Sequence, residues 1–173
     1  MHPPLFLHCN PLVSMAFNYY LSFGVLENHR DELAAVINQF GDHYTCCEWS
    51  PYLIGPSEIT YDKAIYINIG CRIISDLSWL ELKLNLKAFE HHNLYSPHID
   101  IDILIQTMNH ATTIISPKTV HYTHSIMLLN QLNQDLIINQ RPIHGWLAGK
   151  ENVHDFRFIT ASSELPSVQA SIS

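Results

Sequence analysis

Apolar and polar residues alternate strictly in two stretches of the chain. Residues 64–74 (AIYINIGCRII) carry an apolar side chain at every second position, as expected for a β-strand with one buried face. That face contains Ile65, Ile67, Ile69, Cys71 and Ile73. The opposite face contains Tyr66, Asn68, Gly70 and Arg72. Residues 99–106 (IDIDILIQ) repeat the pattern, with inward Ile99, Ile101, Ile103 and Ile105 and outward Asp100 and Asp102.

Two other segments favour helices. In residues 27–40 (ENHRDELAAVINQF) apolar residues recur at i, i+3, i+4 and i+7, which predicts a helix that Gly41 is expected to end. These residues are Leu33, Val36, Ile37 and Phe40. Residues 76–92 are predicted to be a helix capped by Asp76, on their length and their Leu, Lys and Glu content, although LELKLNLK also alternates with period two. A third helix or helical turn is expected over residues 121–132.

The remaining segments complete the order of elements. Residues 16–24 and 43–49 are predicted strands, and residues 50–62, rich in Pro, Gly and Ser, are a predicted loop. The resulting order, β-α-β-β-α-β, predicts an α+β fold of the ferredoxin-like split β-α-β type, with an antiparallel sheet and both helices on one face. The other face is then available to display polar residues. We predict an N-terminal extension (1–15), one domain (16–149) and a partly disordered C-terminal tail (150–173).

The amino-acid composition argues against two classes of binding partner, nucleic acids and membranes. The chain has 173 residues and a net charge of −7, with nine Lys and Arg against sixteen Asp and Glu. It lacks the basic cluster that nucleic-acid binding needs, so no nucleic-acid partner is expected. No apolar run approaches the roughly 18 residues of a membrane span, and no signal-peptide pattern is present, so no membrane partner is expected. The four cysteines lack zinc-type spacing and favour a reducing, cytoplasmic location.

Two pairs of outward-facing residues are candidates for chemistry. Asp100 and Asp102 would lie about 7 Å apart at their Cα atoms on a strand, and paired carboxylates suit Mg²⁺ together with the phosphates of a substrate. Tyr66 and Asn68 combine an aromatic ring with an amide that donates and accepts hydrogen bonds, which suits a flat heterocycle. Taken alone, each pair fits an ordinary solvated strand face better than a functional site, because such short motifs specify function weakly.

Six short segments, taken in order, resemble the 6-hydroxymethyl-7,8-dihydropterin pyrophosphokinase family of the folate pathway over about residues 17–132. They are YLSFG (20–24), LIGP (53–56), YIN (66–68), Phe89-Glu90, IDIDIL (99–104) and VHY (120–122). The resemblance implies the ferredoxin-like fold. It also implies an ATP-dependent diphosphotransferase that moves pyrophosphate from ATP to the hydroxymethyl group of the pterin and releases AMP.

The resemblance also implies roles for individual residues. Asp100 and Asp102 would hold two Mg²⁺ ions that bridge the phosphates of ATP, and together with His121 they would be the catalytic residues. The pterin would contact Ile54, Gly55, Tyr66 and Asn68. ATP would contact Glu90, Ile103, Lys118, His121 and Tyr122. The partners would thus be ATP and a pterin, and the chain is expected to be a monomer or a weak dimer.

The sequence departs from the family in its cations. The family places several Arg, with a Trp, before the Asp pair, whereas residues 88–117 of this chain contain no Lys or Arg. Lys118 and a set of histidines could replace part of that charge. The set comprises His91, His92, His98, His110, His121 and His124. His91 and His92 with Asp100 are a weaker candidate for a transition-metal site.

The sequence is therefore also compatible with two functions other than that of a diphosphotransferase. One is a degenerate, non-catalytic member of the family that serves as a ligand-binding or interaction module, because clamping Arg contribute strongly to phosphoryl transfer. The other is a ferredoxin-like protein of unrelated function, in which the Asp pair is a solvated strand edge.

Overall fold

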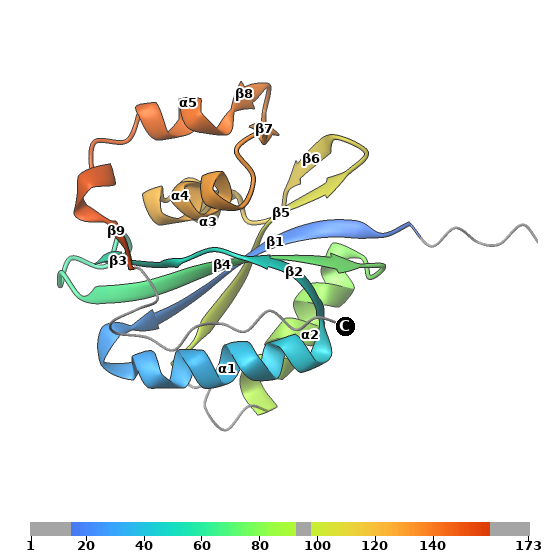
Figure 1. Cartoon of the computed structure of the whole chain (residues 1–173), viewed down its shortest axis with the longest axis horizontal. Helices are drawn as coiled ribbons and strands as arrows, with labels where there is room; N and C mark the ends of the chain where they lie inside the picture. Colours follow the sequence, from blue (N-terminus) through green and yellow to red (C-terminus); the bar gives the residue numbers. More distant parts are fainter. Residues whose placement is uncertain (1–14, 93–97, 160–173) are drawn as a thin grey trace, which may run out of the picture.

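A mostly antiparallel sheet forms the centre of the computed structural model, which describes residues 15–92 and 98–159 (Figure 1). The path through the sheet is β6-β5-β1-β4-β3-β9, and β2 pairs with β4 beside that path. The strands are β1 (Phe17–Leu26), β2 (Thr45–Trp49), β3 (Tyr52–Pro56), β4 (Ile65–Ser75), β5 (Asp100–Met108), β6 (Ala111–Ile114) and β9 (Arg157–Ile159). A separate two-stranded sheet joins β7 (Ile137–Ile138) to β8 (Arg141–Pro142).

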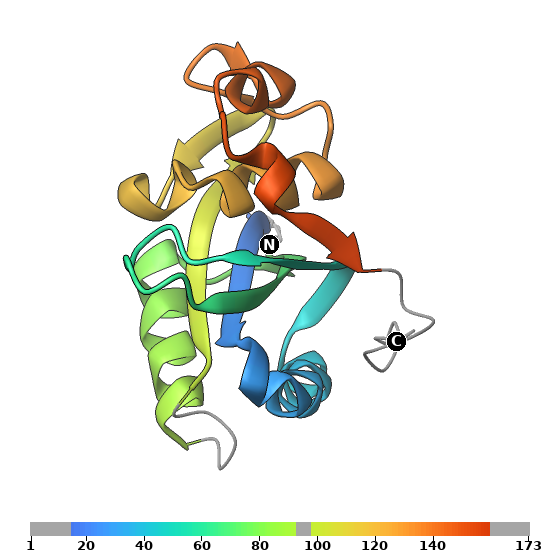
Figure 2. The same cartoon turned by 90° about the vertical axis from the view of Figure 1, so that its left-hand side faces the viewer.

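Helices cover both faces of the sheet. α1 (Arg30–His43) and α2 (Trp79–His92) lie on one face, and α3 (Pro117–Val120), α4 (Thr123–Leu132) and α5 (Ile143–Ala148) lie on the other (Figures 1 and 2). Single 3₁₀ turns, Glu27–His29 and Val153–Asp155, precede α1 and β9. This architecture confirms the predicted α+β ferredoxin-like fold, with an antiparallel sheet and the two predicted helices, α1 and α2, on one of its faces.

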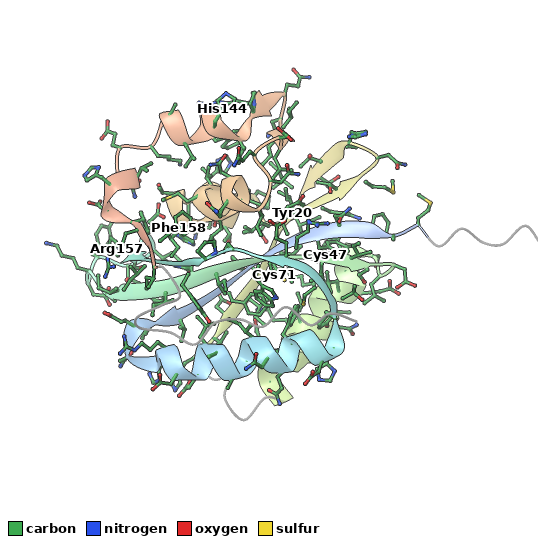
Figure 3. The ribbon with its side chains drawn as sticks, viewed as in Figure 1. Tyr20, Cys47, Cys71, His144, Arg157 and Phe158 are labelled. Atoms are coloured by element: carbon green, nitrogen blue, oxygen red, sulfur yellow. The ribbon has the colours of Figure 1, made fainter. Side chains whose placement is uncertain are left out.

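The alternation read from the sequence matches the two buried clusters. Phe23, Ile69 and Ile101 belong to the cluster under α1 and α2, whereas Tyr20 belongs to the cluster under α4 and α5. Figure 3 labels Tyr20 and Cys71, which lie on opposite faces of the sheet. The prediction was wrong for Ile65, which is 38% exposed at the start of β4.

It was also wrong for Ile105, which packs in the cluster under α4 rather than with Ile101 and Ile103. The register between β1 and β5 shifts between Tyr20 and Leu21, so that Ile103 pairs with Leu21 and Ile105 pairs with Tyr20. Leu104 is the extra residue, and such a β-bulge reverses the facing of every later side chain.

Helix ends differ from the prediction in two places. α1 runs through Gly41 to His43, because Phe40 anchors the last turn by packing its ring 4.9 Å from that of Phe23. α2 begins after Ser78 rather than at Asp76. The Ser78 N–H donates to Glu81 Oε2 (2.9 Å) and the Glu81 N–H donates to Ser78 Oγ (3.3 Å), which is the reciprocal capping box.

The largest difference between the predicted and the observed elements is β3, which lies within the predicted loop over residues 50–62. It pairs with β4 on one side and β9 on the other, and Leu53 is fully buried. Pro51 and Pro56 at its ends resemble loop residues and hide the strand. Residues 150–159, assigned to the tail, thus contribute β9 to the sheet, whereas residues 1–14 and 160–173 lie outside the described part of the chain.

The second face of the sheet is only half available, unlike the open face predicted. α4 lies directly over Gly70, where an added Cβ would come within 3.0 Å of Leu132 and 3.2 Å of Leu128. The helix therefore covers the Gly70 end of β4 and leaves the Tyr66 and Asn68 end uncovered. Polar residues predicted for this face are concentrated in that uncovered half.

Candidate functional site

Strand register brings the two pairs of polar residues to opposite sides of β1. Gly24 of β1 pairs with Asn68 of β4 on one side and with Asp100 of β5 on the other. Ser22 stands in the next row, between Gly70 and Asp102. Because these positions face the same side of the sheet, the amide of β4 and the carboxylates of β5 face one another across the small residues Ser22 and Gly24 of β1.

Gly24 is required by the close approach of Asn68. A Cβ added at position 24 would lie 2.8 Å from Asn68 Oδ1, which is nearer than real Cβ contacts come. The side chain of Asn68, whose exposure is only 7%, therefore extends over the backbone of β1 toward the carboxylates. The small residue at position 24 makes the amide part of the same site as the Asp pair.

A cavity of about 250 Å³ lies over these rows. It is lined by Ser22, Gly24, Pro56, Ser57, Glu58, Ile59, Tyr66, Asn68, Asp100, Asp102, Lys118, Thr119, Tyr122 and His124. Six of these are residues that the resemblance implicates: Tyr66, Asn68, Asp100, Asp102, Lys118 and Tyr122. Two larger hollows, of about 520 and 660 Å³, are lined by none of the residues to which the resemblance gives a role in binding or catalysis. A third, of about 300 Å³, is lined in part by Ile54 and Gly55.

The two carboxylates of the cavity repel one another. Burial, and next the charge of Asp100, raise the pKa of Asp102 to about 6. Lys87 of α2 offsets part of this, with its Nζ 3.9 Å from Asp100 Oδ1. Burial lowers the pKa of Lys87, but its hydrogen bond to Glu90 and the charges of Glu90 and both aspartates raise it overall.

Glu90 connects Lys87 to the strand that carries the Asp pair. It accepts a hydrogen bond from Lys87 (Nζ to Oε2, 3.0 Å) and another from the backbone N–H of Ile101 (to Oε1, 2.9 Å). Ile101 lies between Asp100 and Asp102, so Glu90 ties the end of α2 to the strand that carries the pair. Ile103 is buried below, lining a small hollow with Lys87 and Asp102.

A second charged group faces the cavity from the β3–β4 loop. Glu58 accepts hydrogen bonds from the backbone N–H groups of Thr123 (2.9 Å) and His124 (3.0 Å), and from His124 Nδ1 (2.9 Å). Because an ionised carboxylate only accepts, Nδ1 of His124 carries the proton. Burial would raise the pKa of Glu58, but these hydrogen bonds and the charge of His124 lower it to about 2.

Several nominated residues lie outside the cavity. The exposed ring of His121 packs 5.1 Å from that of Trp146, and its carbonyl accepts a hydrogen bond from Lys150 (2.5 Å). Ile54 and Gly55 line a separate hollow next to Phe156. Of the weaker candidate metal site, the side chain of His92 lies outside the described residues.

Sequence reasoning gave no role to Glu58 or Lys87, and named His124 only within the set of histidines that could replace missing positive charge. Glu58 lies in a Pro- and Ser-rich segment with no regular pattern, 66 residues from its histidine partner, so no spacing signal exists. Lys87 is the residue immediately before the segment without Lys or Arg (88–117). Lys87 and Lys118 flank that segment in the sequence, and both lie at the site in the folded chain. Lys87 approaches Asp100, and Lys118 lines the cavity.

The Asp pair fits a hard divalent cation. Carboxylate oxygens are the ligands that Mg²⁺ prefers. Burial and the charge of Asp100 raise the pKa of Asp102, and a bound cation would offset both effects. The side chain of Asp100 is 69% exposed, which leaves room for water and substrate ligands in the coordination shell.

The solved structures similar to this chain share its fold. Plasmodium falciparum HPPK-DHPS A437G with STZ-DHP matches with a TM-score of 0.61 and 9% identity over 77% of this chain and 45% of that one. The S436F/A437G/A613T triple mutant with pteroate gives a TM-score of 0.63 and 9% identity over 83% and 46% of the two chains. The wild type with pteroate gives 0.58 and 9% over 77% and 42%.

HPPK abbreviates the pyrophosphokinase family named above. The chain is thus distantly related in structure to the HPPK fold, while spanning less than half the length of these matched chains. No protein-family model matches the sequence, and no curated protein matches it. Among the described residues, no helix is long and apolar enough to cross a membrane.

Proposed function

We propose that the cavity binds ATP and 6-hydroxymethyl-7,8-dihydropterin and that the chain transfers pyrophosphate between them. The observation that carries the proposal is the convergence of Tyr66 and Asn68 with Asp100 and Asp102 on one cavity, across Gly24. A ring and an amide on one side and two carboxylates on the other suit a heterocycle next to a polyphosphate. The similarity of fold to HPPK-DHPS supports the same assignment.

Each group has a distinct part in this proposal. Tyr66 would stack on the pterin, and the Asn68 amide would donate to and accept from its edge. Asp100 and Asp102 would hold Mg²⁺, which neutralises phosphate charge. The hydroxymethyl oxygen would bond to the β-phosphorus as the bond to the bridging oxygen breaks. AMP would leave with that electron pair, and the hydroxyl proton would pass to solvent.

The cations of the site are few for this chemistry. Lys118 lines the cavity, while Lys87 is already paired with Glu90 and close to Asp100. Phosphoryl transfer depends mainly on positioning and charge neutralisation, so we expect a slow enzyme. The same scarcity favours the alternative, a non-catalytic module that keeps the ligand-binding cavity.

The decisive experiment is AMP formation from ATP, Mg²⁺ and the hydroxymethyl-dihydropterin, measured by chromatography at high protein concentration. We expect AMP only when all three are present. Asp102→Asn should lower the rate at least ~100-fold, the scale on which transition-state charge stabilisation acts. Asp42→Asn, an exposed carboxylate on α1 across the sheet, is the matched control and should leave the rate unchanged.

Absence of AMP would refute the transferase and leave the binding module. Calorimetry with the pterin and with Mg²⁺ and a non-hydrolysable ATP analogue then separates the remaining possibilities. Binding of either ligand supports the module, and binding of neither supports an unrelated ferredoxin-like protein. A cytoplasmic location and a monomer or weak dimer remain proposals, the first on the sequence argument from the cysteines, of which Cys46, Cys47 and Cys71 have free thiols.

A further inference from the structure

Three side chains of types that can ligate a metal ion lie together outside the cavity. They are His29, Glu32 and His98, and one ligand atom of each lies within 4.8 Å of the others. His29 lies in the 3₁₀ turn after β1, Glu32 in the first turn of α1, and His98 just before β5. The antiparallel pairing of β1 with β5 brings the end of one strand beside the start of the other.

Glu32 has one oxygen engaged and one without a partner. Its Oε1 lies 3.3 Å from His29 Nδ1. Its Oε2 is buried and makes no hydrogen bond to any described residue. A buried carboxylate oxygen with no partner is costly, and in native structures such an atom usually has a missing partner such as water or an ion.

The two imidazoles are already next to each other. The rings of His29 and His98 stack with centroids 3.9 Å apart and planes 17° apart. Ligand atoms around a tetrahedral zinc ion are about 3.3 Å from one another, given metal–ligand distances of about 2.0–2.1 Å. The rings must therefore turn out of the stack so that their nitrogens converge, and the exposed His98 has the freedom to do so.

We propose that His29, Glu32 and His98 bind a divalent transition metal ion of the Zn²⁺ class, with water completing the coordination. Two imidazoles and one carboxylate are a donor set that zinc accepts, whereas Mg²⁺ prefers oxygen ligands alone. Glu27 and Asp31 in the same turns add negative charge, which offsets the positive end of the α1 dipole.

The bound ion would join the start of α1 to the start of β5. It would also place positive charge two residues from Asp100, in the segment of the sequence that has no Lys or Arg. This site is independent of the proposed transferase, because it shares no ligand with the Asp pair.

The test is metal binding to the full chain after dialysis against a chelator. Zn²⁺ is titrated calorimetrically with Mg²⁺ present in excess to occupy the Asp pair, and Co²⁺ is titrated while its absorption spectrum is recorded. We expect saturable Zn²⁺ binding and a Co²⁺ spectrum of low coordination number. His98→Gln and Glu32→Gln should each weaken Zn²⁺ binding at least tenfold, while His154→Gln, an exposed histidine elsewhere, should not.

Thermal unfolding gives a second readout that does not depend on activity. Zn²⁺ at 100 times its dissociation constant should raise the Tm of the native chain by about 5–10 °C, and the gain should be lost in His98→Gln. Circular dichroism of the metal-free variants checks that they fold. Absence of Zn²⁺ binding, or binding that both substitutions leave unchanged, would overturn the proposal, whatever the outcome of the AMP assay.

Discussion

At the scale of single residues, the site depends on a glycine, Gly24, which has no side chain. Gly24 lets the Asn68 amide cross β1, and any larger residue at position 24 would occupy the space 2.8 Å from Asn68 Oδ1. The alternation in the sequence identified Asn68 as outward-facing. It could not show that the side chain is buried, because burial here comes from neighbouring strands and the β3–β4 loop.

Gly24→Ala should therefore displace the amide and weaken pterin binding about tenfold, since the loss of one or two good hydrogen bonds costs on the order of 1 kcal/mol. Pterin fluorescence titration measures the effect. Gly149→Ala is the control, because its added Cβ meets nothing closer than 3.8 Å. Pterin affinity unchanged in Gly24→Ala would show that Asn68 does not contact the pterin.

At the scale of elements, the sequence predicted those that bury one regular face and missed those defined by their partners. β4, β5 and α1 have their own periodicity and were predicted within a few residues. β3 was missed because only its pairing with β4 and β9 makes it a strand. The same reason hid Glu58, whose role exists only once the β3–β4 loop meets the first turn of α4.

Glu58 should stabilise α4 as a cap supplied from another part of the chain. Its pKa falls from 4.5 in the unfolded chain to about 2 in the folded one, so its contribution is present above pH 4.5 and lost as the pH falls through 2. We expect Glu58→Gln to lower the free energy of unfolding by about 1–2 kcal/mol at pH 7, in line with the loss of a helix cap and part of an ion pair.

Urea unfolding at pH 7 and at acid pH checks this. The difference between wild type and Glu58→Gln should shrink as the pH falls from 4.5 toward 2, and the exposed control Glu151→Gln should show no difference at pH 7. A Glu58→Gln variant as stable as the wild type at pH 7 would mean that neutral Gln caps α4 equally well.

At the scale of the whole molecule, the sheet divides its second face between packing and chemistry. α4 covers the Gly70 end of β4, and the bulge at Leu104 turns Ile105 toward that helix, so the apolar half of the face is closed. The other half keeps Asp100 and Asp102 beside Tyr66 and Asn68. A pattern of apolar and polar residues predicts which face a side chain occupies, but not how far a helix extends over it.

In the half of the face that α4 leaves uncovered, the closely spaced Asp100 and Asp102 should lower the free energy of unfolding. The pKa of Asp102 rises from 3.8 to about 6 on folding, so the folded state favours its protonated form. Below pH 3.8 the Asp102 carboxyl therefore does not lower the free energy of unfolding. That free energy declines as the pH rises from 3.8 through 6. Since ionised Asp102 faces Asp100 at neutral pH, we expect Asp102→Asn to raise the free energy of unfolding by about 1–2 kcal/mol at pH 7.

Urea unfolding at pH 4 and pH 7, with and without Mg²⁺, measures this. The gain of Asp102→Asn should be small at pH 4 and reach its full size by pH 7, while Asp42→Asn should gain nothing. Mg²⁺ should stabilise the wild type at pH 7 and have less effect on Asp102→Asn, because the cation relieves the repulsion that the substitution removes. The variant that loses AMP formation would then be the more stable protein, as expected where a fold keeps two close carboxylates for their chemistry. If Asp102→Asn is instead less stable than the wild type at pH 7, favourable contacts of Asp102 outweigh its repulsion with Asp100.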